Sequence, residues 1–444
     1  MPDHWLWAYQ VGPLTVIKCV GLAALVAALL RLLAKGTLPP LYRLPEAWCS
    51  FVYLLVAFVS CSSRDLAGMG LGEIEKILAI LSLFIVTVVM VDTEDRFRRI
   101  ILFAIAGQAF CSLYVVRQWF QFEASYSEFR SFGGLTDDAN YFAIAVVLWL
   151  PVALMLVPVC KSRFERVFCA ACAVTMLVGF LISGSRGGLI GVAIAALQLI
   201  WRSKRRLRNL LLTAFMSLAL ATASLFSGSS AVSRVLHPSA GDVASTQARL
   251  NLWKAALGVI KSHPLFGVGS AAFTIALSHD AHYNVSHNTY LDVLGELGLA
   301  GFLPFMGILI LVYRRLGNLA GIRTHAPPAL QCIATGFRAG LAGYFVGAFF
   351  LSTWEQQVLW LLVFLSMCMA WLQRAPQATP EQASRPTRGQ LPTSRRGRSL
   401  PGRWVPSHRQ GMVRNDFAAG YQRSLIRRTA APYRQSGRLG RRGF

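Results

Sequence analysis

The feature that most constrains this chain is a succession of long apolar segments between residues 12 and 372. A helix that crosses a membrane needs about 20 consecutive, mostly apolar residues. Charged residues make up 14% of the chain and hydrophobic residues 55%, whereas soluble domains carry about 25% charged residues. The sequence therefore predicts an all-α, polytopic membrane protein with about eleven transmembrane helices. The predicted spans are 12–34, 46–62, 75–91, 99–118, 139–159, 165–182, 187–203, 208–226, 296–314, 330–351 and 354–372.

Lysine and arginine gather in alternate short loops between these spans, and such loops normally lie in the cytoplasm. This places the N-terminus outside, the C-terminus in the cytoplasm, and the segments 119–138, 183–186 and 227–295 on the extracytoplasmic face. No ATP is available there, so a reaction on that face needs a substrate that is already activated. The basic residues are Arg31, Lys35 and Arg43; Arg96, Arg98 and Arg99; Lys161, Arg163 and Arg166; Arg202, Lys204, Arg205, Arg206 and Arg208; and Arg314, Arg315 and Arg323.

Two regions follow from this pattern. Residues 1–372 form a membrane domain with one large extracytoplasmic loop, 227–295, between the eighth and ninth predicted helices. Residues 373–444 carry sixteen arginines and only two acidic residues, and we expect a disordered cytoplasmic tail that touches anionic lipid headgroups. The tail has no aromatic platform for bases, so nucleic acid is not an expected partner.

The segment Ser183-Gly-Ser-Arg186-Gly-Gly188 lies at the outer junction of the sixth and seventh predicted spans. A cation at the end of a membrane helix is costly unless it is paired or hydrated. The planar guanidinium of Arg186 suits bidentate binding of phosphate oxygens. The alternative is an arginine at a tight turn that extends to the membrane surface.

Residues 246–262 predict an amphipathic helix along the membrane surface, with Thr246 as its N-cap and Pro264 ending it. Arg249 lies one turn before Trp253. Arg249 is either a second phosphate ligand that faces Arg186 or a contact to lipid headgroups. The predicted apolar face consists of Leu250, Trp253, Leu257 and Ile260, and the predicted turn after the helix contains Gly267 and Gly269.

The ninth predicted span is preceded by Ser286-His287-Asn288-Thr289. Asn288, Asp292 and Glu296 are spaced by four residues, which predicts one polar stripe along a helix that faces a hydrated cavity or partner charges. His287 lies at the mouth of this stripe. It is a candidate general base, and the alternative is a solvated loop histidine.

Two further groups of polar residues allow other interpretations. His279, Asp280 and His282 could form a metal site with His287, since the residue types and spacings permit it. Asp137 and Asp138 suit a divalent cation or sugar hydroxyls, or simply a turn and cap before the fifth span. We expect no metal, because no second cluster supports one.

In this order the motifs resemble those of the bacterial O-antigen ligase and polymerase superfamily, over roughly residues 130–320. The resemblance implies a GT-C-type, metal-independent, inverting glycosyltransferase of the inner membrane without a cofactor, which moves a glycan from undecaprenyl diphosphate to an acceptor hydroxyl. The matching motifs are Asp138-Ala-Asn140, Ser183-Gly-Ser-Arg-Gly-Gly188, Arg249-x-x-x-Trp253, His263-Pro-Leu-Phe-Gly-Val-Gly269, His287-Asn-x-Tyr-Leu291 and Glu296-Leu-Gly298.

By this resemblance Arg186 and Arg249 stabilise the diphosphate and His287 is the base. The residues expected to contact substrate are Asp138, Asn140, Trp253, Asn288 and Glu296. The expected partners are the lipid-linked glycan donor, a lipid or glycan acceptor, and membrane lipids.

The acceptor distinguishes two enzymes of this type. Transfer to lipid A-core would make the chain a ligase in lipopolysaccharide biosynthesis, and transfer to another glycan would make it an O-antigen or exopolysaccharide polymerase. A transporter or flippase of lipid-linked sugars is the alternative from another class. Such proteins commonly carry inverted repeats and charges at mid-membrane, which this sequence lacks. Ligases of the superfamily often have twelve helices, one more than is predicted here.

Overall fold

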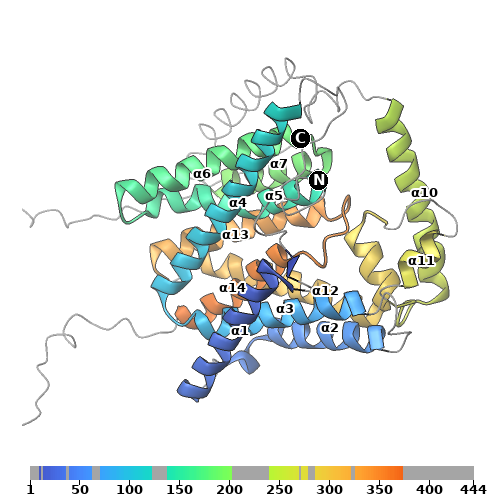
Figure 1. Ribbon diagram of the computed structural model, residues 1–444, viewed down its shortest axis with the longest axis horizontal. Coiled ribbons are helices and arrows are strands. Elements are labelled where there is room, and N and C mark those ends of the chain that lie inside the picture. Colours follow the sequence, from blue (N-terminus) through green and yellow to red (C-terminus); the bar gives the residue numbers. More distant parts are fainter. Residues whose placement is uncertain are drawn as a thin grey trace, which may run out of the picture. The chain divides into compact units, whose positions relative to one another are not determined.

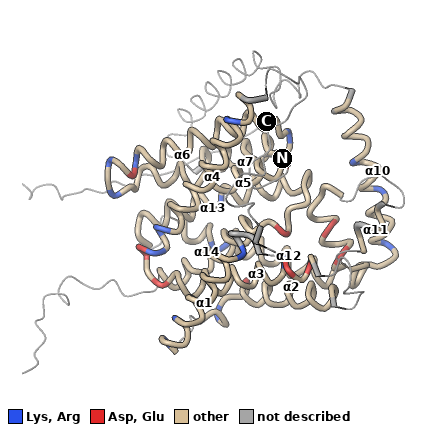
Figure 2. Tube along the Cα trace, in the orientation of Figure 1, with Lys and Arg blue, Asp and Glu red and all other residues tan. Residues whose placement is uncertain are grey.

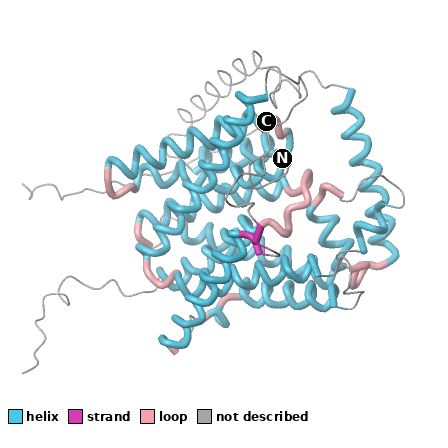
Figure 3. The backbone as a smooth tube through the Cα atoms, in the orientation of Figure 1, coloured by secondary structure: helices cyan, strands magenta, loops and turns pink. Residues whose placement is uncertain are grey.

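The computed structural model describes residues 10–11, 14–36, 40–62, 71–122, 138–202, 240–269, 272–278, 286–321 and 326–373. Helices dominate these residues (Figures 1 and 3). Each predicted span coincides with a helix except 208–226, which lies outside the described residues, as do 374–444. The chain divides into two units, Met1–Gln377 and Ala378–Phe444.

Two 3-10 turns, Leu41–Arg43 and Val157–Val159, lie in the connections after α1 and after α5. Near the start, β1 (Gln10–Val11) and β2 (Leu14–Thr15) form a small antiparallel hairpin in which Val11 pairs with Leu14. The described helices are α1 (Val16–Lys35), α2 (Pro45–Ser62), α3 (Leu71–Met90), α4 (Glu94–Phe122), α5 (Ala139–Leu156), α6 (Arg163–Ile182), α7 (Arg186–Arg202), α10 (Ala240–Ser262), α11 (Ala272–Ser278), α12 (Thr289–Leu319), α13 (Pro328–Gly347) and α14 (Gln357–Leu372).

Four helical segments among the described residues are long and apolar enough to cross a membrane. The predicted class, a helical membrane protein, is confirmed to that extent. The number of eleven spans and the GT-C arrangement stay predictions. The four segments are Glu94–Phe120, Ala139–Val159, Arg163–Ile182 and Thr289–Leu319, and shorter apolar helices are Pro45–Cys61, Arg186–Trp201 and Gln357–Leu372.

Helix α13 packs against α5, α7 and α12, and glycines let it approach the first two closely. A Cβ atom at Gly336 or Gly340 would overlap the backbone of α5, and one at Gly343 would overlap the backbone of α7. Helices in a membrane gain little from burying apolar surface against each other, so close van der Waals contact between small residues has to hold them together. The glycines of α13 supply that contact.

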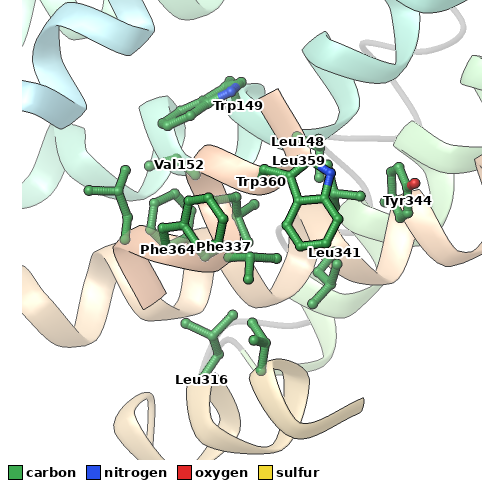
Figure 4. Packing of buried hydrophobic residues seen from close by; sticks show 14 of the residues in the cluster. Leu148, Trp149, Val152, Leu316, Phe337, Leu341, Tyr344, Leu359, Trp360 and Phe364 are labelled. Atoms are coloured by element: carbon green, nitrogen blue, oxygen red, sulfur yellow. The ribbon is translucent and has the colours of Figure 1, made fainter. Parts of the chain in front are cut away.

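Large side chains fill the space between α5, α13 and α14 (Figure 4). Trp149 on α5 meets Phe337 on α13 edge to face, with 5.7 Å between the ring centroids. Trp360 packs on Phe364 along α14, also at 5.7 Å. All four side chains are buried, and each aromatic pair adds about 0.5–1.5 kcal/mol beyond its buried area. This dense packing holds α5, α13 and α14 in fixed positions relative to one another.

Ion pairs join several of the predicted cytoplasmic loops at one end of the helices. Arg98 Nη2 on α4 lies 2.6 Å from Glu165 Oε1 on α6, and Lys161 Nζ lies 2.7 Å from Asp95 Oδ1. Further pairs join the end of α1 to the α3–α4 connection and the start of α2 to the end of α12. The ion pairs therefore place these basic loops at one end of the helices, as the charge pattern predicted. That this end faces the cytoplasm stays a prediction. The further pairs are Arg31 and Lys35 with Asp92, and Arg315 with Glu46.

Helix α12 is interrupted at Gly298, whose φ of 62° and ψ of −163° are not helical. The segment 264–269 lies against this break and bonds to it on both sides. Backbone N–H groups of Val268 and Gly269 donate to the carbonyls of Gly295 and Glu296 at 2.9 Å each. Inside a membrane every backbone polar group needs a partner, and irregular backbone is tolerated only where the protein supplies one. Residues 264–269 supply it here.

The return bonds run from α12 to the same segment. The N–H groups of Leu299 and Ala300 donate to the carbonyls of Pro264 and Leu265, at 2.9 and 3.0 Å. A Cβ atom at Gly298 would overlap the backbone of Leu265, so the approach requires glycine. The predicted turn at Gly267 and Gly269 is confirmed, since both have positive φ.

Replacing Gly298 with alanine should destabilise the protein strongly. A side chain at its positive φ costs about 1–3 kcal/mol, and the overlap with Leu265 adds to that cost. The matched control is Gly258→Ala on α10, where nothing lies within 4 Å of the added Cβ and alanine should gain about 0.5–1 kcal/mol. Thermal unfolding of both purified variants measures the difference. Equal melting temperatures would contradict the packing described here.

Candidate functional site

The starts of α5 and α7 are joined by side-chain hydrogen bonds. Asp138 is the N-cap of α5 and accepts from the backbone N–H of Asn140. Asn140 Oδ1 accepts from the Ser185 hydroxyl at 2.9 Å. Ser185 Oγ in turn accepts from Gly188 N–H at 3.2 Å, which caps α7. Arg186, half-buried, is the first residue of α7.

The glycines after Arg186 allow neighbouring segments to pack closely around it. A Cβ atom at Gly188 would lie 2.9 Å from both Ala143 Cβ and Phe180 Cε2. A Cβ atom at Gly187 would lie 3.0 Å from Phe350 Cβ, in the segment after α13. Because these positions are glycine, α5, α6 and the segment after α13 can pack closely against the start of α7, where Arg186 lies.

Helix α10 differs from its prediction at its start. It begins at Ala240, so Thr246 lies inside the helix and is not its N-cap. Among its described residues, Leu252 and Ala256 are buried where α10 packs against α11 and α12. Leu250 and Leu257, of the predicted apolar face, are 44% and 47% exposed, and contact of this face with the membrane surface stays a prediction.

Trp253 ties α10 to the segment before α12. Its indole Nε1–H donates to the backbone carbonyl of Ser286 at 3.0 Å. Arg249 lies one turn earlier on α10 and is half-buried. This hydrogen bond holds this part of α10 beside Ser286, the residue before His287.

His287 stands between two buried residues at the start of α12. Ser286 Oγ accepts from Asn288 N–H at 3.1 Å and donates to the Asp292 carboxylate. Asn288 caps α12, since its Oδ1 accepts from the N–H groups of Tyr290 and Leu291 at 3.0 and 3.2 Å. The side-chain oxygen of Asn288 is therefore already used as an acceptor by the first turn of α12.

The backbone of His287 is left-handed, with a φ of 52°. Among non-glycine residues such a conformation is uncommon, and it often marks functional sites. The imidazole is half-buried, whereas Ser286 and Asn288 beside it are buried. Their fixed positions orient the histidine without covering it.

Charges from two other helices act on His287. Burial lowers the pKa of its imidazole, and the guanidinium of Arg249 lowers this pKa further. The carboxylate of Asp138 acts in the opposite direction and raises the pKa. Arg249 on α10 and Asp138 at the start of α5 thus lie within electrostatic reach of one imidazole. Arg186 joins the same region through Ser185 and Asn140.

The three residues of the predicted polar stripe are buried at the start of α12: Asn288, Asp292 and Glu296 are 4%, 2% and 8% exposed. One oxygen of Asp292 and one of Glu296 have no hydrogen-bond partner among the described residues. Carboxylates in this position need a hydrated cavity or a ligand. Figure 2 shows acidic stretches beside α12 and basic ones along α10.

Sequence reasoning missed a second polar group near Glu296. Lys76 Nζ on α3 lies 2.7 Å from Glu73 Oε1 and 2.7 Å from Glu355 Oε2, in the connection before α14. In the sequence these residues stand out only as charges near the starts of two distant predicted spans, 75–91 and 354–372.

Among the described residues, no group of three or more His, Cys, Asp or Glu is placed to hold a metal ion. The other members of the alternative metal site, His279, Asp280 and His282, lie outside the described residues, as does Asp137.

Residues 171–306 match the model of the family described as O-antigen ligase. The predicted resemblance to the O-antigen ligase and polymerase superfamily is thus confirmed over this part of the chain. The match includes Arg186, Arg249, His287 and the break at Gly298, and it leaves out Asp138 and Asn140. A comparison with curated proteins gives no match.

The opposing charges around His287 give a prediction on its titration. Replacing Arg249 with glutamine removes a charge that lowers the pKa of His287, so the pKa should rise. Asp138→Asn removes a charge that raises it, so the pKa should fall. Diethyl pyrocarbonate modifies neutral imidazole, and mass spectrometry of the His287 peptide across pH follows both shifts.

Lys254→Gln on α10 is the matched control. Its side chain is exposed and does not contribute to the pKa of His287, so the pH midpoint of modification should match that of the parent. Shifts of the same sign in the Arg249 and Asp138 variants would contradict the arrangement.

Proposed function

We propose that the protein transfers a glycan from a polyprenyl diphosphate to an acceptor hydroxyl, at the place where Arg186, Arg249 and His287 lie. The observation that carries this proposal is that α10 is held beside His287: Trp253, one turn after Arg249, donates to the Ser286 carbonyl at 3.0 Å, and the Arg249 guanidinium lowers the pKa of His287. A guanidinium near an imidazole suits an anionic leaving group beside a hydroxyl that must lose its proton. The match to the O-antigen ligase family supports the same reaction class.

The proposed base needs a neutral imidazole at neutral pH. Burial and Arg249 both lower the pKa of His287, which keeps the ring able to accept a proton. A general base of this kind typically contributes about 10²–10⁴-fold to the rate. Asp138 would limit this lowering and stabilise the ring once it is protonated.

In the proposed step the acceptor oxygen attacks the anomeric carbon from the side opposite the diphosphate. The new glycosidic bond forms as the bond from that carbon to the diphosphate oxygen breaks, so the configuration inverts. The acceptor proton moves to His287, and the electron pair leaves with polyprenyl diphosphate. Arg186 and Arg249 would bind the diphosphate oxygens, where negative charge develops.

Further side chains are proposed to contact the glycan. Trp253 would offer an aromatic face, with its indole N–H already used by Ser286. Glu296 would accept hydrogen bonds from sugar hydroxyls, since one of its oxygens lacks a partner among the described residues. Asn288 gives its side-chain oxygen to two N–H groups of α12, so its amide N–H groups would serve a substrate. Asn140, which accepts from the Ser185 hydroxyl, is also proposed to contact the glycan.

The match supports a ligase- or polymerase-type role in polysaccharide biosynthesis. Within that role we propose the periplasmic face of the bacterial inner membrane as the place of reaction, with the N-terminus outside and the C-terminus in the cytoplasm. Lipid A-core is the proposed acceptor, and undecaprenyl diphosphate the proposed carrier. The chemistry as drawn needs neither metal nor cofactor.

His287→Ala should lower glycan transfer from lipid-linked oligosaccharide to acceptor lipid by about 10²-fold or more, because the base is lost. Arg186→Gln and Arg249→Gln should each lower it by about 10²–10³-fold, because leaving-group charge is no longer stabilised. Transfer by purified protein, with and without EDTA, is measured from the gel shift of the acceptor.

His263→Ala and Arg166→Gln are the matched controls. Both side chains are exposed, and Arg166 lies at the other end of the helices. Both variants should transfer at the parental rate. A parental rate in His287→Ala would remove the base, and loss of transfer in EDTA would replace the proposed chemistry with a metal-dependent one.

A deletion strain separates the roles. Long glycan retained on the lipid carrier at the outer leaflet indicates a ligase, and single-repeat glycan indicates a polymerase. Donor held at the inner leaflet would instead indicate transport and overturn the proposed transfer.

A further inference from the structure

A cavity of about 350 Å³ lies between α7, α12 and α13, away from the candidate site. Its wall comes from the last turns of α7, from the second half of α12 and from the middle of α13. Because α7 and α12 both begin at the candidate site, the cavity belongs to the opposite half of the membrane. The residues that line it are Ile194, Leu197, Gln198, Trp201, Tyr313 and Arg338.

Arg338 provides the charge in this cavity. Its Cζ atom lies 4.5 Å from the centroid of the Tyr313 ring, a favourable cation–π distance. Its Nε–H is buried and has no hydrogen-bond partner in the described structure. A Cβ atom at Gly317 would lie 3.0 Å from Arg338 Cζ, so the glycine leaves room for the guanidinium.

A second donor beside Arg338 is also unsatisfied. Gln198 Oε1 accepts from the Tyr313 hydroxyl at 3.1 Å, which points its amide nitrogen elsewhere. That nitrogen, Nε2, is buried and lacks a partner among the described residues. Two orphaned donors thus belong to side chains of one cavity. Buried donors without acceptors are rare in native proteins, and a water, an ion or a bound ligand normally supplies the missing acceptor.

The charge balance distinguishes this cavity from other arginine sites in the structure. Arg31, Arg98 and Arg315 each pair with a carboxylate. No acidic residue is among the described residues that line the cavity around Arg338. A guanidinium within the membrane-spanning region is costly unless an anion or water compensates it.

We propose that this cavity binds the phosphate of an anionic phospholipid from the leaflet opposite the candidate site. Arg338 and Gln198 donate to the phosphate oxygens, and Tyr313 holds the guanidinium in place. The acyl chains lie along Leu197 and Trp201, whose side chains are 52% and 69% exposed. Basic cavities between membrane helices bind anionic headgroups in this way. The site is separate from the proposed transfer reaction.

Native mass spectrometry of the detergent-solubilised full chain, titrated with dioleoyl phosphatidylglycerol, tests the proposal. Arg338→Gln should weaken retention of one bound lipid by about fivefold or more. Arg314→Gln on α12 removes the same charge from an exposed side chain outside the cavity and should retain the lipid as the parent does. Equal losses in the two variants would show general attraction to basic residues and overturn the site.

Two further arms identify the ligand. Phosphatidylcholine should bind less well than phosphatidylglycerol, and inorganic phosphate should not displace the lipid. Displacement by inorganic phosphate would assign the cavity to the free ion and overturn the lipid proposal. A photoactivatable phosphatidylglycerol needs no variant, so it covers the case in which Arg338→Gln fails to fold. It should crosslink residues 194–201 of the parental protein, and crosslinks elsewhere alone would also overturn the proposal.

Discussion

The hydrogen bonds between residues 264–269 and the interrupted helix α12 are the interaction on which the rest of the structure depends. A break in a membrane helix exposes backbone groups that lipid cannot satisfy. Here one short segment takes up bonds on both sides of Gly298, from Gly295 to Ala300. Because that segment directly follows α10, the same bonds seat α10, and with it Arg249, against the helix that begins beside His287.

The sequence predicted the broad architecture well, because length and apolarity decide which segments become membrane helices. It also predicted which basic loops share one end, and the structure joins them by ion pairs. The glycines predicted the turn at Gly267 and Gly269. The hydrogen bonds of this turn to α12 could not be predicted, because no local pattern shows that the turn pairs with a helix about thirty residues later.

Side-chain partners across the fold were the part that sequence reasoning could not supply. The periodicity of α10 did not show that Leu252 and Ala256 are buried against neighbouring helices. Lys76 and Glu355 were not singled out from the sequence, because only the packing of α3 beside α14 makes them partners. Asn288 fitted a substrate contact by type, but its oxygen caps α12.

Three helices begin around His287, since α5 starts after Asp138, α7 at Arg186 and α12 after Asn288. Each helix carries a partial positive charge at its first turn, from amide dipoles aligned along its axis. The main chain itself therefore makes this corner electropositive, before any guanidinium is counted. Substituting side chains can weaken that field, but only unwinding the helices would abolish it.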